Sequence, residues 1–388
     1  MISQRAVCIK STACVKNSVT GESVMAKDNR VLVVVLGNMG LSHARAYRAI
    51  AGFALVGLCS RSIAERTDIA CEFSGVPQFN DYAMALAALK PDAVSINTWP
   101  DTHEGYAKLA FAAGAHVFLE KPIAQTVAGA EAVVAAALRA NRKLVVGYIL
   151  RVHPSWQRFI EIGRTLGKPL VMRMNLNQQS AGANWQVHKH LMDTISPIVD
   201  CGVHYVDVMC QVTGAKPVRV HAIGARLSDD LKPGMYNYGH LHVAFDDGSI
   251  GWYESGWGPM MSEVAFFVKD MVGPKGAVSI VASEEGGTVK EGARVTASSD
   301  IDSHSKTGAL RLHHAALKPD GGFARADELI RTDDEPSHQQ LCDREQRVFL
   351  KAIRENVDLT AHMADATSSL RIVLAADESV RTGEVVRL

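Results

Sequence analysis

The stretch His116-Val117-Phe118-Leu119-Glu120-Lys121-Pro122 decides the fold, because it is a short apolar run that ends in an acid, a base and a proline. An apolar run of this length bounded by proline is typical of a buried β-strand. Proline disfavours the helical conformation for the preceding residue, so we expect Lys121 to lie extended at the strand's end. Ligands bind at the carboxyl ends of strands in open α/β sheets. Lys121 is therefore a candidate catalytic residue, although a solvated Glu-Lys pair in a loop would show the same residues.

Similar apolar runs alternate with helical patterns throughout the first half of the chain. This alternation predicts βαβ units on a parallel sheet, and hence an α/β domain. The expected strands are residues 31–36, 53–58, 92–97, 115–119 and 143–147. The helical patterns between them run to residue 49 and cover residues 62–74, 102–113 and 125–140.

The turn after the first strand is a candidate phosphate-binding site. Its six residues, Val35-Leu36-Gly37-Asn38-Met39-Gly40, stand where the dinucleotide fingerprint G-x-G-x-x-G is expected, with the first glycine replaced. Gly37 allows close approach to a pyrophosphate, and Gly40 allows close packing of the helix on the strand. The backbone N–H groups of Asn38 and Met39 open a helix that favours anions. A plain tight turn, or the turn of a methyltransferase sheet, would use the same residues.

The ends of the second and third strands give further cofactor candidates. The second strand ends in Ser60-Arg61, where NAD-binding sites usually carry an acid for the ribose hydroxyl. An arginine suits a 2′-phosphate, so the sequence favours NADP(H) over NAD(H). The third strand leads into Thr98 and Pro100 on the same rim, and His103 follows in the first turn of a helix. His103 would face either the cofactor or the surface.

The second half predicts an α+β domain with a large, mostly antiparallel sheet. Strand patterns follow one another without intervening helices, and Asp246-Asp247-Gly248-Ser249 forms a hairpin turn between two of them. The expected strands are residues 170–176, 217–223, 239–246 and 249–256, with two more in 265–281. Helices are expected at residues 154–166, 196–213, 342–356 and 365–381.

The helix at residues 196–213 carries a polar stripe. Asp200, His204, Asp207 and Gln211 fall on one face, with Asp200 one turn before His204 and able to orient its ring. A His-Asp pair satisfied within its own domain has the same spacing.

The stretch 178–195, expected to be an irregular loop, supplies Trp185 and His188 as candidates for the wall of a sugar pocket. The histidines show no spacing such as H-E-x-x-H, so no metal site is predicted.

These residues together resemble a known family. Residues 31–154 resemble the cofactor half of the Gfo/Idh/MocA oxidoreductases, and the resemblance extends over nearly the whole chain after residue 30. The matching motifs are Gly37-x-x-Gly40-x-x-His43, Asn97-Thr98-x-Pro100-x-x-His103, Glu120-Lys121-Pro122, Tyr148-x-x-Arg151-x-x-Pro154 and Asp200-x-x-x-His204. The resemblance implies that Lys121 lies beside the nicotinamide and the substrate, and it allows a cis Lys121–Pro122 peptide. It also implies that Tyr148 and Arg151 contact substrate, and that the open sheet makes subunit contacts in a homodimer or homotetramer.

The expected activity is an NAD(P)-dependent dehydrogenase acting on a secondary hydroxyl of a sugar, cyclitol or derivative. His204 would take the hydroxyl proton, Asp200 would orient His204, and Lys121 would hold the substrate oxygen, helped if burial lowers its pKa. The roles of Lys121 and His204 are interchangeable from sequence alone. Two alternatives stay open: a glycosidase that oxidises, eliminates and re-reduces with bound nicotinamide, and a non-catalytic nucleotide-sensing regulator.

Composition sets the broader limits. The 388 residues include 41 basic and 41 acidic side chains, a balance that gives no general attraction to nucleic acid or membranes. Seven scattered cysteines without C-x-x-C favour reduced thiols and a cytoplasmic protein. Residues 1–29 are interpreted as a disordered leader or an upstream start before Met25, although a transit peptide would have a similar composition. The cofactor domain is expected at 30–150 and the substrate and oligomerisation domain at 151–388.

Overall fold

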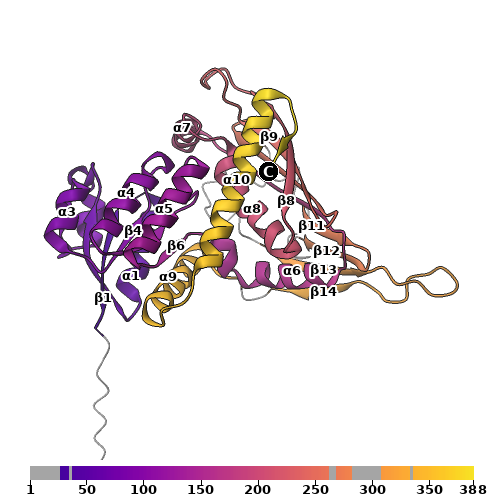
Figure 1. The fold of residues 1–388 in the computed structure, drawn as a ribbon, viewed down its shortest axis with the longest axis horizontal. Coiled ribbons are helices and arrows are strands. Elements are labelled where there is room, and N and C mark those ends of the chain that lie inside the picture. Colours follow the sequence, from indigo (N-terminus) through magenta and orange to yellow (C-terminus); the bar gives the residue numbers. More distant parts are fainter. Residues whose placement is uncertain (1–26, 35–36, 262–267, 282–306, 333–334) are drawn as a thin grey trace, which may run out of the picture.

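The protein is built around two β-sheets that lie side by side, as Figure 1 shows. The computed structural model describes residues 27–34, 37–261, 268–281, 307–332 and 335–388. Most of the predicted leader lies outside these residues. The first sheet and its helices come from the N-terminal part of the chain, and the larger sheet comes from the second half.

The first sheet has six parallel strands in the order β3-β2-β1-β4-β5-β6. This order is that of doubly wound dinucleotide-binding sheets, so the predicted α/β domain is confirmed. The strands are β1 Asn29–Val34, β2 Phe53–Cys59, β3 Gln78–Phe79, β4 Ala93–Ile96, β5 His116–Leu119 and β6 Leu144–Val146. The main helices are α1 Asn38–Ala49, α2 Thr67–Glu72, α3 Tyr82–Leu89, α4 Pro100–Ala112 and α5 Val127–Ala140.

The sequence prediction missed one strand and one helix of this sheet. The strand β3 has only two residues, which is too short for a hydrophobic period to show. The helix α3 is an almost uniformly apolar stretch of alanine, leucine and methionine, so it lacks the polar face that marks an amphipathic helix. Its start signal is present, because the Asp81 side chain accepts a hydrogen bond from the backbone N–H of Met84.

The second sheet has nine strands in the order β14-β13-β12-β11-β7-β10-β9-β8-β15. All neighbours pair antiparallel except β7 and β10, which confirms the predicted, mostly antiparallel sheet. The strands are β7 Val171–Gln179, β8 Pro217–Ala225, β9 Tyr238–Phe245, β10 Ile250–Gly258, β11 Lys269–Gly273, β12 Gly276–Val281, β13 Ala309–His314, β14 Glu328–Arg331 and β15 Val386–Arg387.

The inner face of the second sheet is covered by α6 (Pro154–Thr165) and α8 (Pro197–Thr213), both close to their predicted bounds. Alternate strand residues point at these helices and are fully buried, for example Met172 and Met174 on β7. Ser196 begins α8 by accepting the N–H of Val199. This cap, followed by Pro197, fixes where the helix carrying Asp200 starts.

Residues 178–195 were predicted to be irregular, and this is wrong for their middle part. Gly182–Leu191 form the helix α7. The residue before it, Ala181, has no side chain that can cap a helix, and the first turn carries no acid. The usual signals of a helix start are therefore missing from the sequence.

The chain returns to the first domain at its C-terminal end. The helix α9 (His338–Arg354) begins with a capping box between Ser337 and Gln340 and packs on α1. Phe349 of α9 is fully buried, and its ring centroid lies 6.2 Å from those of both Phe53 and Phe118. The longer helix α10 (Thr360–Thr382) contacts β6 and α5 on one side and α8 and β8 on the other. Both predicted closing helices are confirmed.

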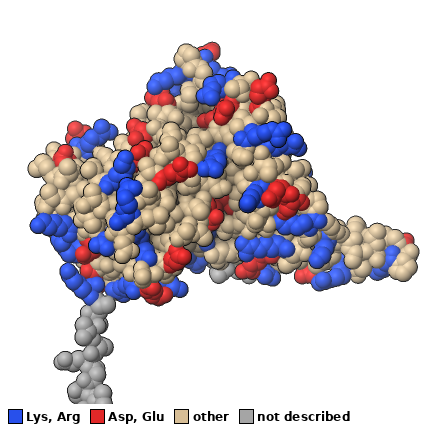
Figure 2. All heavy atoms as spheres, viewed as in Figure 1, with Lys and Arg blue, Asp and Glu red and all other residues tan. Residues whose placement is uncertain are grey.

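The surface view agrees with the balanced composition. On the face drawn in Figure 2, basic and acidic side chains are interspersed over both domains. The five cysteines among the described residues are free thiols. Within the same residues, no helix combines the length and the apolar character needed to cross a membrane.

Candidate active site

Lys121 joins the two domains by an ion pair. It lies two residues after the end of β5, and its peptide bond to Pro122 is cis. About four-fifths of its side chain is shielded from solvent. Its Nζ lies 3.0 Å from Oδ1 of Asp200 and 3.1 Å from the Asp200 carbonyl oxygen. Asp200 lies in the first turn of α8, so the carboxyl edge of the parallel sheet is held against the start of the helix of the second domain.

The charges around Lys121 keep it protonated. Burial alone would lower the pKa of its ammonium group, but Asp200, Cys201 and Glu120 raise it, and the net pKa is raised. The expectation that burial would lower this pKa is therefore wrong, because the carboxylates outweigh the loss of solvent. At neutral pH Lys121 is a cation that can stabilise a developing negative charge but is a poor base.

Glu120 supports the turn that carries Lys121. It is buried, and its Oε1 accepts a hydrogen bond from Nε2 of His43 at 2.9 Å, while its Oε2 accepts the backbone N–H of Lys121 at 3.2 Å. Burial opposes the charge of Glu120, but the hydrogen bond from His43 and the nearby ammonium of Lys121 outweigh it, so the pKa of Glu120 is lowered. Glu120 is thus an ionised support for the backbone that carries Lys121.

His204 lies one turn after Asp200 on α8 and is buried. Its ring stands edge-on to that of Tyr148, with the centroids 5.7 Å apart. The Asp200 carboxylate contacts the ammonium of Lys121 and, at 3.4 Å, the thiol of Cys201. Asp200 is thus the counter-ion of Lys121. Its predicted role in orienting His204 stays a prediction.

His188 and Trp185 lie on α7, beside the ion pair. The ring of His188 stacks on Trp257 with centroids 4.5 Å apart, and its Nδ1 lies 3.0 Å from Oγ of Ser180. Burial lowers the pKa of His188 to about 4, against the opposing charge of Asp200, so its imidazole is neutral. Trp185 is buried, with Lys189 over its ring at 5.8 Å. Its predicted place in the wall of a substrate pocket stays a prediction.

A crevice at the sheet edge matches the predicted cofactor residues. A cavity of about 70 Å³ opens where β1, β2 and β4 end, at the point where the strand order reverses. Ser60, Arg61 and Thr98 all line it. The other lining residues are Val34, Cys59, Asn80, Tyr82, Trp99, Thr102 and Tyr106.

The start of α1 has room for a phosphate. A Cβ at Gly37 would meet no atom within 4 Å, and the exposed residues Gly37 and Asn38 open the helix without any acid in its first turn. Free N–H groups and an open approach are what a pyrophosphate requires at a helix N-terminus. Gly40 is buried, as close packing of the helix on the sheet requires, and Met39 is half-buried. The predicted dinucleotide site fits these residues.

His103 does not lie on the surface, which was one of the two positions predicted for it. It is fully buried, and its Nδ1 and Nε2 lie 2.7 Å and 3.0 Å from the carbonyl oxygens of Pro122 and Thr98. Its ring thus connects the Lys121–Pro122 turn to the rim after β4. Both nitrogens face protein carbonyls, so His103 supports the site. Its predicted contact with the cofactor stays a prediction. Pro100 begins α4, as expected for the first position of a helix.

Arg151 binds acidic side chains of the second domain, and its predicted contact with substrate stays a prediction. Its guanidinium makes a bidentate pair with Asp207 of α8 at 2.9 Å and 2.5 Å and contacts Asp365 of α10 at 2.8 Å. These contacts use most of its donors, so Arg151 holds the two helices to the end of the first sheet. The Tyr148 hydroxyl is likewise buried against Oγ of Ser369, at 2.6 Å. The ring of Tyr148 faces that of His204, and the predicted contact of Tyr148 with substrate stays a prediction.

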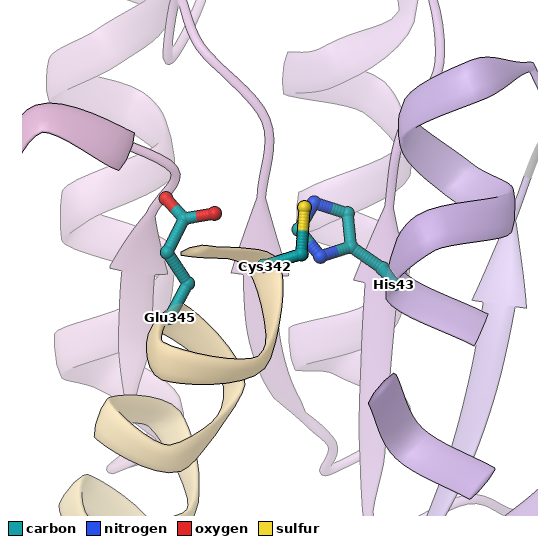
Figure 3. A group of neighbouring side chains, drawn as sticks. All are labelled: His43, Cys342 and Glu345. Atoms are coloured by element: carbon teal, nitrogen blue, oxygen red, sulfur yellow. The ribbon is translucent and has the colours of Figure 1, made fainter. Parts of the chain in front are cut away.

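A buried cluster of His43, Cys342 and Glu345 lies where α9 packs on α1 (Figure 3). Their potential metal-binding atoms all lie within 4.8 Å of one another. However, both ring nitrogens of His43 are engaged, by Glu120 at 2.9 Å and by Nε2 of Gln346 at 2.8 Å. Burial raises the pKa of the Cys342 thiol and of the Glu345 carboxyl. A metal ion would have to displace existing hydrogen bonds and take two protons from this site.

Comparison with known proteins agrees with this geometry. Residues 29–148 match the model of an oxidoreductase family with an NAD-binding Rossmann fold, and residues 158–268 match the GFO/IDH/MocA C-terminal domain. Together the two matches define the class: a chain with an NAD-binding Rossmann domain followed by a GFO/IDH/MocA C-terminal domain. The chain belongs to the Gfo/Idh/MocA family.

Two curated relatives are dehydrogenases of polyhydroxylated rings. The UDP-N-acetylglucosamine 3-dehydrogenase of Acidithiobacillus ferrooxidans is 30% identical over 201 residues, which cover 52% of this chain and 59% of the relative. The inositol 2-dehydrogenase of Klebsiella pneumoniae is 27% identical over 251 residues, covering 62% of this chain and 68% of the relative. The matched regions thus cover 59% of the length of the first relative and 68% of that of the second.

Solved structures show the same fold over almost the whole chain. The scyllo-inositol dehydrogenase of Lactobacillus casei with bound NAD(H) and scyllo-inositol has a TM-score of 0.69 at 21% identity, covering 93% of this chain and 99% of that one. The aldose-aldose oxidoreductase of Caulobacter crescentus with glycerol has a TM-score of 0.71 at 20% identity, covering 93% and 100%. At this identity, these structures establish the fold alone.

The pairing of Lys121 with Asp200 leads to a prediction about its pKa. In an Asp200→Asn variant the ammonium loses its nearest negative charge but stays buried, so its pKa should fall relative to the native protein. The pH dependence of Lys121 labelling by a lysine-selective reagent, followed by mass spectrometry, measures this change. The variant Glu131→Gln removes a carboxylate that pairs on the surface with Arg371 and should leave the pKa of Lys121 unchanged. An equal or higher pKa in Asp200→Asn would contradict the assignment.

Proposed function

We propose that this protein is an NAD(P)-dependent dehydrogenase that oxidises a secondary hydroxyl of a sugar, cyclitol or sugar derivative. The observation that carries the proposal is the ion pair of Lys121 with Asp200, 3.0 Å long. It places a buried cation at the end of a parallel strand, on the same rim as the cofactor crevice. His204, a second group suited to proton transfer, lies one turn further along the same helix.

The geometry favours a division of work between Lys121 and His204. When bound, the nicotinamide supplies the acceptor for the hydride that leaves the substrate carbon. Lys121, held as a cation by Asp200, donates a hydrogen bond to the substrate oxygen and stabilises its growing negative charge. His204 takes the hydroxyl proton and returns it when the reaction runs in reverse. Because the pKa of Lys121 is raised, the base is assigned to His204.

The substrate pocket is completed by His188 and the Tyr148 ring. A neutral imidazole both donates and accepts a hydrogen bond, as a hydroxyl does, so His188 suits a polyol better than a charged substrate. Ser180 binds its Nδ1, which leaves Nε2 for the ligand. The curated relatives named above act on inositol and on UDP-N-acetylglucosamine, both of which carry adjacent ring hydroxyls. The two alternatives, a glycosidase and a nucleotide sensor, are less well supported because these relatives are dehydrogenases.

The first test removes the charge of Lys121. In Lys121→Met the apolar stem is kept, and kcat should fall by about 100- to 1,000-fold because the substrate oxygen loses its stabilising donor. The rate of NAD(P)H formation is measured with a panel of inositols, aldoses and nucleotide sugars. The variant Lys108→Met, which removes a surface lysine of α4 paired with Glu104, serves as the control. Cofactor binding, followed by fluorescence, should persist in both variants. Unchanged turnover in Lys121→Met would exclude the mechanism.

The cofactor preference is assigned to Arg61. This side chain lines the crevice next to Ser60, where no acid is present to bind the 2′-hydroxyl of NAD. A planar guanidinium suits the 2′-phosphate of NADP through paired hydrogen bonds. These features support a preference for NADP(H).

Substitution of Arg61 tests this preference. In Arg61→Ala the KM for NADP should rise by about tenfold or more, since a charge-assisted hydrogen bond is lost, while the KM for NAD changes little. Steady-state kinetics with both cofactors measure the ratio. Arg66→Ala, in which the lost guanidinium pairs with Asp68 on the surface beyond the crevice, is the matched control. A native enzyme that prefers NAD would rule out this assignment.

The outer face of the second sheet is proposed to bind a second copy of this chain. A groove of about 770 Å³ runs over this face. Val171, Ile250 and Trp252 line it, and Ile250 is 50% exposed although it lies in the middle strands of the sheet. An exposed apolar face of this kind is typical of a subunit interface.

A charge placed on this face should separate the subunits. In Ile250→Asp, burying an unpaired carboxylate would oppose association, so sedimentation at micromolar concentration should give mainly monomer where the native protein gives dimer or larger. Leu109→Asp, at an exposed position of α4 in the first domain, should leave the assembly intact. A monomeric native protein would contradict the proposal.

A further inference from the structure

Gln346 of α9 is buried and makes two hydrogen bonds at the junction with the first domain. Its Nε2 lies 2.8 Å from Nδ1 of His43, and its Oε1 lies 2.5 Å from the hydroxyl of Tyr47. Both partners come from α1, 303 and 299 residues earlier in the chain. No part of this contact belongs to the cofactor crevice or to the substrate pocket described above.

The donors and acceptors of this group run in one consistent direction. The Tyr47 hydroxyl can only donate to the Gln346 carbonyl oxygen, which leaves the amide N–H to donate to Nδ1 of His43. His43 then carries its proton on Nε2 and donates it to Glu120. The backbone N–H of Lys121 donates to the other oxygen of the same carboxylate. The series of bonds therefore leads from Gln346 through His43 and Glu120 to the residue that binds the substrate oxygen.

Only glutamine satisfies this arrangement among side chains of its size. A glutamate would present acceptors to both Tyr47 and His43, and a methionine would present neither a donor nor a strong acceptor. The orientation of the amide follows from Glu120, whose carboxylate can only accept and therefore takes the Nε2–H of His43. Nδ1 of the neutral ring then accepts from the Gln346 amide, and this hydrogen bond stabilises that tautomer.

Glu345, the neighbour of Gln346, is consistent with this direction. It is 3% exposed, and among the described residues neither of its carboxyl oxygens has a hydrogen-bond partner. Burial raises the pKa of the Glu345 carboxyl, and the nearby charge of Glu120 raises it further. One of two neighbouring carboxyls thus keeps the proton, and Glu120 keeps the charge that His43 and Lys121 require.

We propose that Gln346 is a positioning residue for Lys121: it fixes the tautomer and ring orientation of His43, which holds Glu120 and through it the backbone of Lys121. The proposal rests on the proposed function for its effect on catalysis, but the hydrogen-bond direction stands apart from any activity. The C-terminal helix α9 thereby sets the geometry of the active site without touching substrate or cofactor.

The native protein gives the first test. Labelled with ¹⁵N-histidine, His43 should show the Nε2–H tautomer, with an unprotonated Nδ1 that accepts a hydrogen bond. An Nδ1–H tautomer would overturn the proposal, because Gln346 would then be turned around and Glu120 would hold the proton. This measurement needs no substrate, so it decides the proposal even if the chain oxidises no polyol at all.

The variants separate positioning from packing. In Gln346→Met, kcat should fall by about tenfold while the KM for the cofactor stays within a factor of two or so, since only the placement of Lys121 is loosened. The matched control is Gln339→Met on the same helix. Gln339 also bonds to α1, through the Ser42 carbonyl oxygen at 2.9 Å, but does not touch His43. Thermal unfolding should show similar losses of stability for the two variants, and only Gln346→Met should lose kcat.

A further variant changes the signature of His43 itself. In Gln346→Glu the ring lies between two carboxylates, so both nitrogens should be protonated and the ¹⁵N shifts should become those of an imidazolium. If this variant does not fold, comparing kcat in Gln346→Met and Gln339→Met still tests whether Gln346 positions Lys121. Equal kcat losses in that pair, or no loss in either, would reduce Gln346 to a packing residue.

Discussion

The ion pair of Lys121 with Asp200 is the contact on which the rest of the structure depends. It joins the carboxyl edge of the parallel sheet to the first turn of α8, with side chains that are 19% and 13% exposed. A pair this far from solvent is costly to break, because removing one partner leaves an uncompensated charge, at about 3–5 kcal/mol. The same pair keeps Lys121 protonated. In the proposed function, the contact that joins the two domains is therefore also the one that prepares the cation for the substrate oxygen.

The support for this pair comes from distant parts of the chain. Glu120 and His43 lie under the backbone of Lys121, and α9 closes over His43 from the C-terminal end. On the other side, Arg151 links the end of the first sheet to Asp207 of α8 and to α10. The helices α8, α9 and α10 are thus held by polar contacts as well as by packing. A mobile junction would let the ion pair separate.

Much of this could be predicted from sequence, because the decisive signals are local. The β-branched run before Gly37 and the run before Glu120 each predict a buried strand, and the spacing of Asp200 and His204 places them on one helix face. What failed depends on contacts that are distant in sequence. The ion pairs of Arg151 with Asp365 and of Lys121 with Asp200 form only when the two domains have packed together. The direction of the pKa shift of Lys121 could not be predicted, since burial and the carboxylates act in opposite senses. The helix α7 was missed because it lacks a capping residue.

The central claim is that a hydride passes directly between a polyol carbon and a nicotinamide held at this junction. The most direct measurement is the transfer of deuterium from carbon-deuterated inositols and aldoses to NAD(P)⁺, followed by mass spectrometry of the reduced cofactor. We predict that the reduced nicotinamide formed with an active substrate carries one deuterium. Reduced cofactor without deuterium, or release of the deuterium to water, would contradict the account.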